Sequence, residues 1–215
     1  VHMDVRTSDP KHSFFLLINL PELDNKGIID QFDGSKTYNE THMIKLTAID
    51  LDGTLFTSSQ QISPANKQAL AKALAMGIHI VIVTGRGRRG AEMALDMLGM
   101  ELPYICAAGA LARPGREGVN LYAHVFHRPK ELSHVIDFAR QTEAGLIAET
   151  LDGNPIWFGP DALGQIMDPM TAKDARGSIR SREPEKDFDR PLLKITVVGE
   201  PELLQQAEKI IHQQC

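Results

Sequence analysis

Residues 47–55 read Thr-Ala-Ile-Asp-Leu-Asp-Gly-Thr-Leu. The apolar segment 45–50 predicts a buried β-strand, with Asp50 at its carboxyl end and Asp52 just beyond it. In open α/β sheets, ligands bind at the carboxyl ends of the strands. The stretch therefore predicts a parallel sheet whose carboxyl edge carries two neighbouring carboxylates.

The residues that follow alternate between helix and strand signals. Ser63 is a favourable N-cap, Pro64 suits the first position of a helix, and Gly77 can end that helix. The β-branched run 78–83 predicts a strand covered on both faces, which is typical of a parallel sheet.

A second helix and a third strand complete this unit. Segment 88–98 predicts a helix that Gly99 ends, and 103–107 predicts a short buried strand. The residues of the helix expected to face inward are Met93, Ala94, Met97 and Leu98. This alternation predicts an α/β fold built on a Rossmann-like, doubly wound parallel sheet.

After about residue 124 the pattern changes to hairpins mixed with helices. The turn Asp-Gly-Asn at 152–154 predicts a hairpin of strands 146–150 and 155–158. The other expected elements are helices at 129–142, 161–170 and 200–213 and strands at 177–183 and 192–198. We therefore expect a core at 43–124 and an α+β domain at 125–215. Residues 1–42 are interpreted as a leader or fusion segment, with a strand at 14–20 as the alternative.

Composition narrows the classes of partner and compartment. The net charge of -5 gives no general attraction to nucleic acid or to anionic membranes. No apolar run approaches the roughly 18 residues of a membrane span. Of the two cysteines, Cys106 lies in an apolar run and Cys215 is the last residue, which predicts a buried thiol and no disulfide framework. A cytoplasmic location is the corresponding expectation.

Asp50 and Asp52 can divide the labour of phosphoryl transfer. One carboxylate can attack phosphorus while the other transfers protons to and from oxygen. Two such charges facing an anionic phosphate require a cation, and a hard, oxygen-liganded Mg²⁺ meets that need. Gly53 would let a backbone N–H approach the phosphate. The alternative is an ordinary Asp-Gly turn, but the position after an apolar strand favours catalysis.

The second motif, Thr-Gly-Arg at 84–86, directly follows the strand 78–83. The Thr84 hydroxyl and the Gly85 amide can donate to a phosphate oxygen, and Arg86 adds positive charge. Taken alone, the motif is equally typical of a loop. The small residues at 107–110 are compatible either with a tight turn or with the mouth of a site.

Together these motifs resemble the haloacid-dehalogenase-like (HAD) hydrolase superfamily, in its Cof-type branch with a type IIB α/β cap. The run 50–55 matches the first motif of that family and 84–86 matches the second. Ala-Gly-Ala at 108–110 stands where the branch usually has Asn-Gly-Ala, so an asparagine contact is absent.

The resemblance implies a role for each motif residue. Asp50 would be the nucleophile and Asp52 the general acid and base. Mg²⁺ would be held by the Asp50 carboxylate and the Asp52 backbone carbonyl. Phosphate would be bound by Thr84, with Gly85 and Gly53, and Arg86 is a candidate substrate-binding residue. Residues from about 125 onward would form the cap that selects the substrate.

The same resemblance implies a later lysine and a final acidic motif, and the sequence to Cys215 contains neither. Lys194 lies in the apolar strand 192–198 and is interpreted as a cap residue rather than the catalytic lysine. Without later strands, segment 45–50 would have an open edge suited to self-association. A chain truncated before the last two core motifs is the favoured interpretation. The alternatives are strands supplied by another chain or by the leader, and a scaffold that no longer turns over.

The sequence thus predicts a Mg²⁺-dependent phosphatase that hydrolyses a small phosphorylated metabolite through an aspartyl-phosphate. The alternative is a catalytically impaired fragment or a non-catalytic binding module. A phosphotransferase would use the same chemistry, and the sequence does not identify the substrate.

Overall fold

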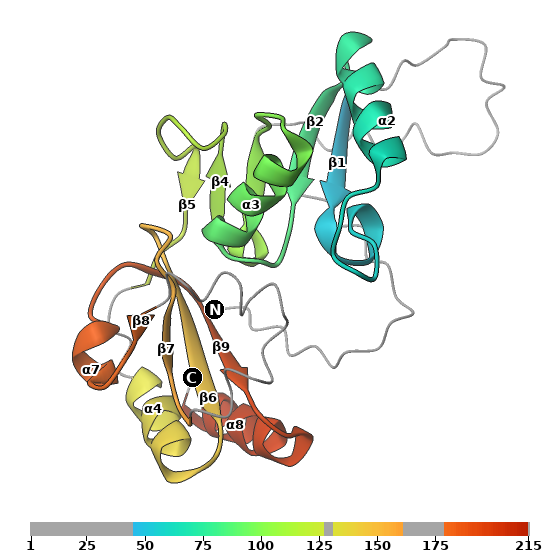
Figure 1. The fold of residues 1–215 in the computed structure, drawn as a ribbon. Coiled ribbons are helices and arrows are strands. Elements are labelled where there is room, and N and C mark those ends of the chain that lie inside the picture. Colours follow the sequence, from blue (N-terminus) through green and yellow to red (C-terminus); the bar gives the residue numbers. More distant parts are fainter. Residues whose placement is uncertain (1–44, 127–130, 161–178, 215) are drawn as a thin grey trace, which may run out of the picture.

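The computed structural model describes residues 45–126, 131–160 and 179–214, which form two sheets. The first sheet has the strand order β1-β2-β3-β4-β5 (Figure 1). Its strands are β1 (Leu46–Asp50), β2 (His79–Val83), β3 (Tyr104–Cys106), β4 (Leu111–Arg113) and β5 (Tyr122–Ala123). β1, β2 and β3 are parallel, whereas β4 and β5 add two antiparallel strands that the sequence pattern did not predict.

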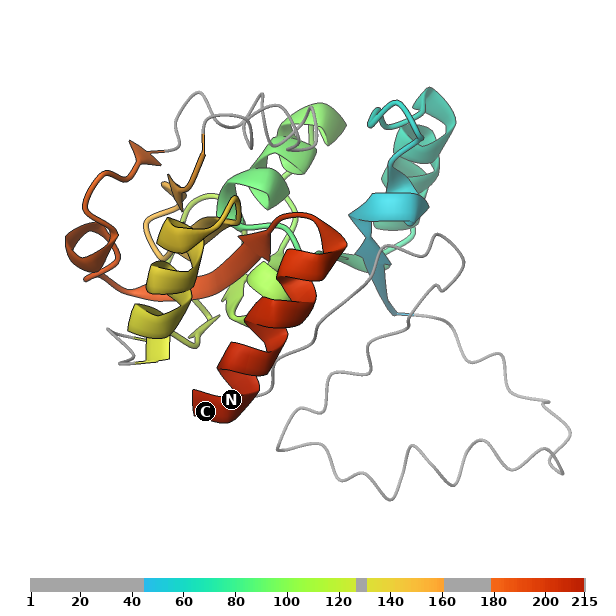
Figure 2. The same cartoon turned by 90° about the horizontal axis from the view of Figure 1, so that it is seen from below.

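Two helices connect the parallel strands. Helix α2 (Pro64–Ala75) begins after Ser63, whose Oγ accepts a hydrogen bond from the N–H of Asn66 at 3.1 Å. Helix α3 (Arg88–Leu98) ends at Gly99, which adopts the left-handed conformation with φ of 68°. The chain steps in one direction from β1 to β3, so right-handed crossovers place both helices on one face of the sheet (Figures 1 and 2).

The inward face of α3 differs in part from the prediction. Ala94 and Leu98 are buried as expected, but Met93 and Met97 are only partly buried. The other buried positions of the helix are Gly90, Ala91 and Leu95. The methionines therefore flank the buried stripe rather than define it.

The prediction of a buried first strand is wrong. Leu46 is 57% exposed, and Ala48 and Asp50 are exposed as well. β1 is the terminal strand of the described sheet and has β2 as its neighbour there. In β2, Ile80 and Ile82 are buried, whereas Val81 and Val83 are half-buried and His79 is exposed, so helices cover the strand fully on one face only. The parallel pairing itself is confirmed.

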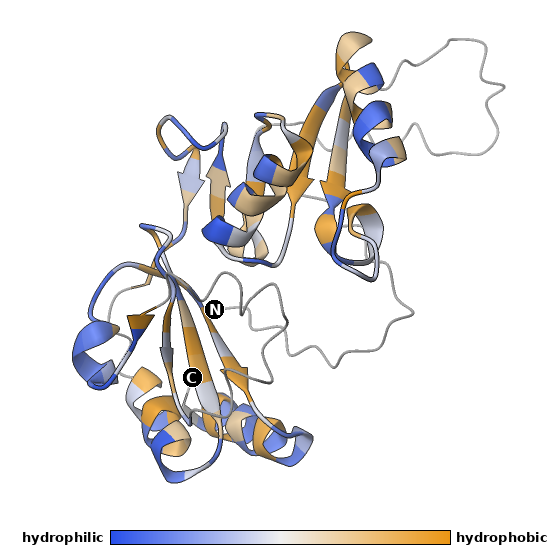
Figure 3. Cartoon of the chain, viewed as in Figure 1, coloured by the Kyte–Doolittle hydropathy of each residue, from blue (hydrophilic) through white to orange (hydrophobic). Residues whose placement is uncertain are grey.

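The second sheet has the order β8-β7-β6-β9. Its strands are β6 (Gly145–Thr150), β7 (Ile156–Phe158), β8 (Ile179–Arg180) and β9 (Leu192–Val198). Helices α4 (Glu131–Gln141) and α8 (Pro201–Gln214) pack against one face, and α7 (Pro184–Asp187) is a single short turn (Figure 2). In Figure 3, β2 and β6 are coloured mostly as apolar strands. The predicted hairpin of β6 and β7 is confirmed.

Several expectations fall outside the described residues or beyond what they resolve. The alternative strand at 14–20 and the helix at 161–170 lie outside them. The expected strand at 177–183 is represented by β8 alone. No helix among the described residues is long and apolar enough to span a membrane.

Cys106 closes β3 and is fully buried, with no disulfide partner. Burial raises the pKa of its thiol to about 12, because the thiolate would lose its hydration. The thiolate is the reactive form of cysteine. In the folded protein the thiol is therefore unreactive for two reasons: reagents cannot reach it, and it stays protonated.

We predict that Cys106 stays unreactive toward a thiol reagent such as Ellman's reagent at pH 8 while the chain is folded. The measurement compares the wild type with Cys106→Ala in buffer and in denaturant. Both proteins should give the same thiol count in buffer, and the wild type should give one more in denaturant. A higher count for the folded wild type would contradict the burial of this residue.

Candidate active site

The carboxyl ends of β1 and β2 bring the two sequence motifs together. Asp50 is the last residue of β1 and lies in register with Val83, the last residue of β2. Thr84 follows immediately, is 3% exposed, and donates its N–H to the carbonyl of Ile105 at 2.9 Å. The exposed Asp50 and the buried Thr84 therefore stand at the ends of adjacent parallel strands.

The residues after Asp50 form a tight turn, Leu51–Leu55, in which Asp52 and Gly53 have non-helical backbone angles. Leu51 and Leu55 are buried and anchor the turn in the core, and the N–H of Phe56 donates to the carbonyl of Leu51 at 2.8 Å. Gly53 has a φ of 75° with open space around it, so backbone conformation rather than crowding favours glycine here. The anchored turn presents Asp52 on its exposed side.

Arg86 holds Asp52 in a two-pronged ion pair. Its Nε lies 2.8 Å from Oδ2 of Asp52, and its Nη2 lies 2.6 Å from Oδ1. The guanidinium also stacks over the ring of Phe56, with 5.3 Å to the ring centre. The side chain of Arg86 is 14% exposed against 53% for Asp52, so the arginine is the more fixed partner.

This pairing links the two motifs directly. The backbone N–H of Arg86 donates to Oγ1 of Thr84 at 3.1 Å, while its side chain reaches back to Asp52. Sequence reasoning proposed Arg86 for substrate binding and missed its contact with Asp52. The two residues are 34 positions apart, so only the parallel pairing of β1 and β2 could have indicated their contact.

The third loop of the site is conformationally strained. After β3, Ala107 and Ala108 adopt positive φ values of 51° and 56°, followed by Gly109 at 95°. L-residues other than glycine and asparagine rarely adopt this region. The N–H of Ala107 donates to the carbonyl of Arg86 at 2.6 Å, which ties this loop to the second motif.

A side chain of the second sheet contacts the second motif. Nζ of Lys194, in β9, donates to the carbonyl of Gly85 at 2.7 Å. Burial lowers the pKa of Lys194, and the neighbouring Glu149 carboxylate opposes this effect. The sequence interpretation of Lys194 as a residue outside the first sheet is consistent with its place in β9, but its contact with the motif was not foreseen.

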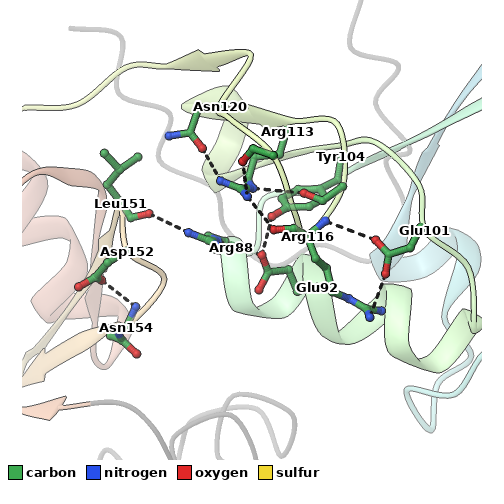
Figure 4. A network of polar contacts seen from close by, with 12 residues as sticks. Arg88, Glu92, Glu101, Tyr104, Arg113, Arg116, Asn120, Leu151, Asp152 and Asn154 are labelled. Carbon is green, nitrogen blue, oxygen red and sulfur yellow. Dashed lines mark hydrogen bonds and ion pairs between the residues drawn. The ribbon is translucent and has the colours of Figure 1, made fainter.

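A separate network of polar contacts at the start of α3 also joins the first sheet to the second (Figure 4). Nε of Arg88 lies 2.9 Å from Oε1 of Glu92, which also accepts the Tyr104 hydroxyl at 2.8 Å. Nη1 of Arg88 approaches the carbonyl of Leu151 at 3.4 Å, at the end of the β6–β7 hairpin. Arg88 therefore spans from the first sheet to the second.

The acidic residues of the site suit a hard divalent cation. Among the described residues, no three His, Cys, Asp or Glu side chains gather in a metal-binding group. Mg²⁺ does not need such a cage, because it is commonly held by one or two carboxylates together with water and substrate phosphate. The exposed Asp50 carboxylate offers a ligand of this kind.

The comparisons with known proteins now identify the family. Residues 47–215 match the family model of haloacid dehalogenase-like hydrolases. The protein M6_Spy0533 of Streptococcus pyogenes serotype M6, named for an expected phosphatase activity, is 30% identical over 181 residues, covering 79% of this chain and 63% of its own. The chain belongs to the haloacid dehalogenase-like hydrolases, in their Cof-type branch, as the two motifs predicted.

Shorter and more distant similarities agree with this assignment. Escherichia coli YbhA, a pyridoxal phosphate phosphatase, is 37% identical over 65 residues, which cover 30% of this chain and 24% of YbhA. A solved haloacid dehalogenase-like hydrolase from Bacteroides thetaiotaomicron superposes with a TM-score of 0.63 at 22% identity, covering 78% of this chain and 62% of that one. The subclass IIB sugar phosphatase BT4131 gives 0.61 at 21% identity, covering 78% and 64%. The structural matches establish the fold.

We predict that Ala108→Gly stabilises the chain by roughly 0.5–1 kcal/mol, because glycine adopts positive φ without steric cost. Ala108 is exposed, so loss of its methyl group removes little packing. Ala110→Gly is the matched control, since φ there is -72° and glycine gains nothing. Urea unfolding should give a higher midpoint for Ala108→Gly and a lower one for Ala110→Gly; the opposite order would contradict the strained loop.

Proposed function

We propose that this chain carries the phosphoryl-transfer site of a phosphatase that hydrolyses a small phosphomonoester. The observation that supports the proposal most is the register of β1 and β2, which sets Asp50 beside the strand end that leads into Thr84. At one edge of a sheet, a carboxylate can attack the phosphorus of a phosphate group while a hydroxyl donates a hydrogen bond to an oxygen of the same group.

The first half-reaction uses both aspartates. A carboxylate oxygen of Asp50 attacks phosphorus and forms an aspartyl-phosphate, while the bond from phosphorus to the leaving oxygen breaks. Asp52 in its protonated form donates a proton to that leaving oxygen. The Arg86 guanidinium contacts Asp52 in the free site, and we propose that it orients this carboxyl group.

The second half-reaction restores the enzyme. Asp52, now ionised, accepts a proton from a water molecule, whose oxygen attacks the phosphorus of the aspartyl-phosphate. The bond between phosphorus and the Asp50 oxygen breaks, which releases inorganic phosphate and the free carboxylate. Thr84 would donate its hydroxyl to a phosphate oxygen, with the backbone N–H groups of Gly53 and Gly85 as further donors.

A bound Mg²⁺ would offset the repulsion between the carboxylates and the phosphate. The Asp50 carboxylate and the backbone carbonyl of Asp52 would hold it. The substrate is a small phosphorylated metabolite. Relatives named for pyridoxal phosphate and for 5-amino-6-(5-phospho-D-ribitylamino)uracil support that class without selecting one member.

We also propose that residues 43–124 form the catalytic core and 125–215 the substrate-selecting cap. β5 ends at Ala123 in the first sheet, and Phe126 pairs with Leu192 of the second sheet. The change of sheet within these few residues supports a boundary near 124. The chain spans 63% of the length of M6_Spy0533 and 62–64% of the solved structures named above.

The proposal predicts that Mg²⁺-dependent release of phosphate from p-nitrophenyl phosphate requires both aspartates. Asp50→Asn should lower kcat by about a thousandfold or more, since the nucleophile is lost. Asp52→Asn should lower it by about a hundredfold, because proton transfer is lost while the nucleophile remains. Asp96→Asn, which alters an exposed ion pair with Arg116, is the matched control and should retain full activity.

Undiminished turnover by Asp50→Asn would reject the nucleophile assignment. A chain that binds phosphate esters without releasing phosphate, with or without Mg²⁺, would instead be the non-catalytic binding module. Intact-mass analysis during turnover adds a direct readout, because the aspartyl-phosphate adds one phosphoryl group to the wild type and none to Asp50→Asn.

A further inference from the structure

The pairing of β6 with β9 contains an irregularity beside the candidate site. Glu149 pairs with Lys194, but the next residue, Thr150, pairs with Leu192, so Leu193 is an extra residue in β9. Bulges of this kind bend a strand and redirect its side chains, and they are common next to active sites. Leu193 is 5% exposed and packs with the hydrophobic core of the first sheet, unlike Leu192, which packs within the second.

The bulge therefore fixes β9 against the first sheet just before Lys194. Leu151, two residues after Glu149 on β6, also packs against the core of the first sheet. Two apolar contacts thus lie at the same end of the Glu149–Lys194 pair, because the strands are antiparallel. These apolar contacts hold the pair next to the loop 85–87.

Lys194 and Glu149 each meet one glycine of this loop. The ammonium group of Lys194 donates to the carbonyl of Gly85. The carboxylate of Glu149 lies over Gly87, so closely that a Cβ at position 87 would overlap it. Gly87 has a φ of -68°, which any residue can adopt, so space rather than backbone conformation favours glycine there.

Glu149 and Lys194 share the face of the second sheet that is opposite α4. Leu146 and Ala148 pack with α4 in a buried cluster, so the alternate residues of β6 point the other way. Glu149 is one of these, and its register partner Lys194 shares its face. Glu149 and Lys194 therefore lie on the face of the second sheet that is next to the candidate active site.

We propose that Glu149 and Lys194 form the recognition pair for the leaving group of the substrate, and that this leaving group bears neighbouring hydroxyls. The inference rests on the phosphatase activity proposed above. It assigns two specificity-determining residues on the second sheet rather than further catalytic groups.

The chemistry of the pair selects hydroxyls. A carboxylate only accepts hydrogen bonds and an ammonium only donates them, whereas a hydroxyl does both. Two adjacent hydroxyls can satisfy the pair at once, one donating to Glu149 and the other accepting from Lys194. An aromatic leaving group such as nitrophenol has no neighbouring hydroxyls and therefore cannot form these two bonds.

The test compares two esters that differ in the leaving group. Glucose 6-phosphate carries neighbouring hydroxyls and p-nitrophenyl phosphate carries none. We expect Lys194→Met and Glu149→Gln each to lower kcat/KM for glucose 6-phosphate by about tenfold or more, mainly through KM, and to change p-nitrophenyl phosphate less than about twofold. Lys186→Met, at an exposed site in α7, is the control and should change neither.

Gly87 permits a second test that alters no charge. Gly87→Ala should displace the Glu149 carboxylate and lower kcat/KM for glucose 6-phosphate as Glu149→Gln does. Adding Glu149→Ala to Gly87→Ala should cause little further loss, because both changes remove the same contact. Fully additive losses would show that Gly87 acts independently of Glu149 and would overturn the assignment of that residue.

The measurements distinguish a failure of the phosphatase proposal from a failure of the recognition pair. Equal losses on both esters for Lys194→Met would make Lys194 a phosphate-neutralising or structural residue and overturn the recognition pair alone. Calorimetric binding of both esters to Asp50→Asn needs no turnover. If no variant or wild type releases phosphate, yet glucose 6-phosphate binding weakens about tenfold in Asp50→Asn/Lys194→Met, the phosphatase proposal fails and the recognition pair stands. Binding that is insensitive to Lys194 overturns the pair.

Discussion

The parallel pairing of β1 with β2 sets the register on which the candidate site depends. Asp50 and Val83 end their strands at the same level, so the turn after Asp50 and the loop after Val83 share one edge of the sheet. A slip of one residue would turn the alternate side chains of β1 to the other face and separate Asp50 from Thr84. The buried Ile80 and Ile82 fix the orientation of β2, the strand against which β1 is set in register.

Within this edge, one arginine joins the elements of the site. Arg86 makes a backbone hydrogen bond to Thr84, a side-chain ion pair to Asp52, and accepts at its carbonyl from Ala107. Each of these partners belongs to a different loop. The half-exposed Asp52 is fixed by a nearly buried guanidinium, so its orientation is set before any ligand arrives. A preset side-chain orientation of this kind suits the proposed phosphoryl transfer, in which most of the protein's contribution is positioning and electrostatics.

Local signals in the sequence were sufficient for the parallel strands, both connecting helices and the hairpin of the second sheet. Ser63 caps its helix and Gly99 ends the next, because these signals act over a few residues. The exposure of β1 was missed, because an apolar strand has the same sequence pattern at the edge of a sheet as at its centre. The contacts of Arg86 with Asp52 and of Lys194 with Gly85 join residues 34 and 109 positions apart, and no local pattern encodes them.

The bulge in β9 explains why the second sheet can approach the site at all. A regular antiparallel pair would direct Leu193 to the face that α4 and α8 cover, away from the first sheet. The extra residue breaks that alternation and places a buried leucine in the core of the first sheet, beside a lysine that donates a hydrogen bond to Gly85. The apolar contact attaches β9 to the core of the first sheet, and the adjacent Lys194 adds a hydrogen bond to the carbonyl of Gly85. Attachment and polar contact are thus assigned to neighbouring residues of one strand.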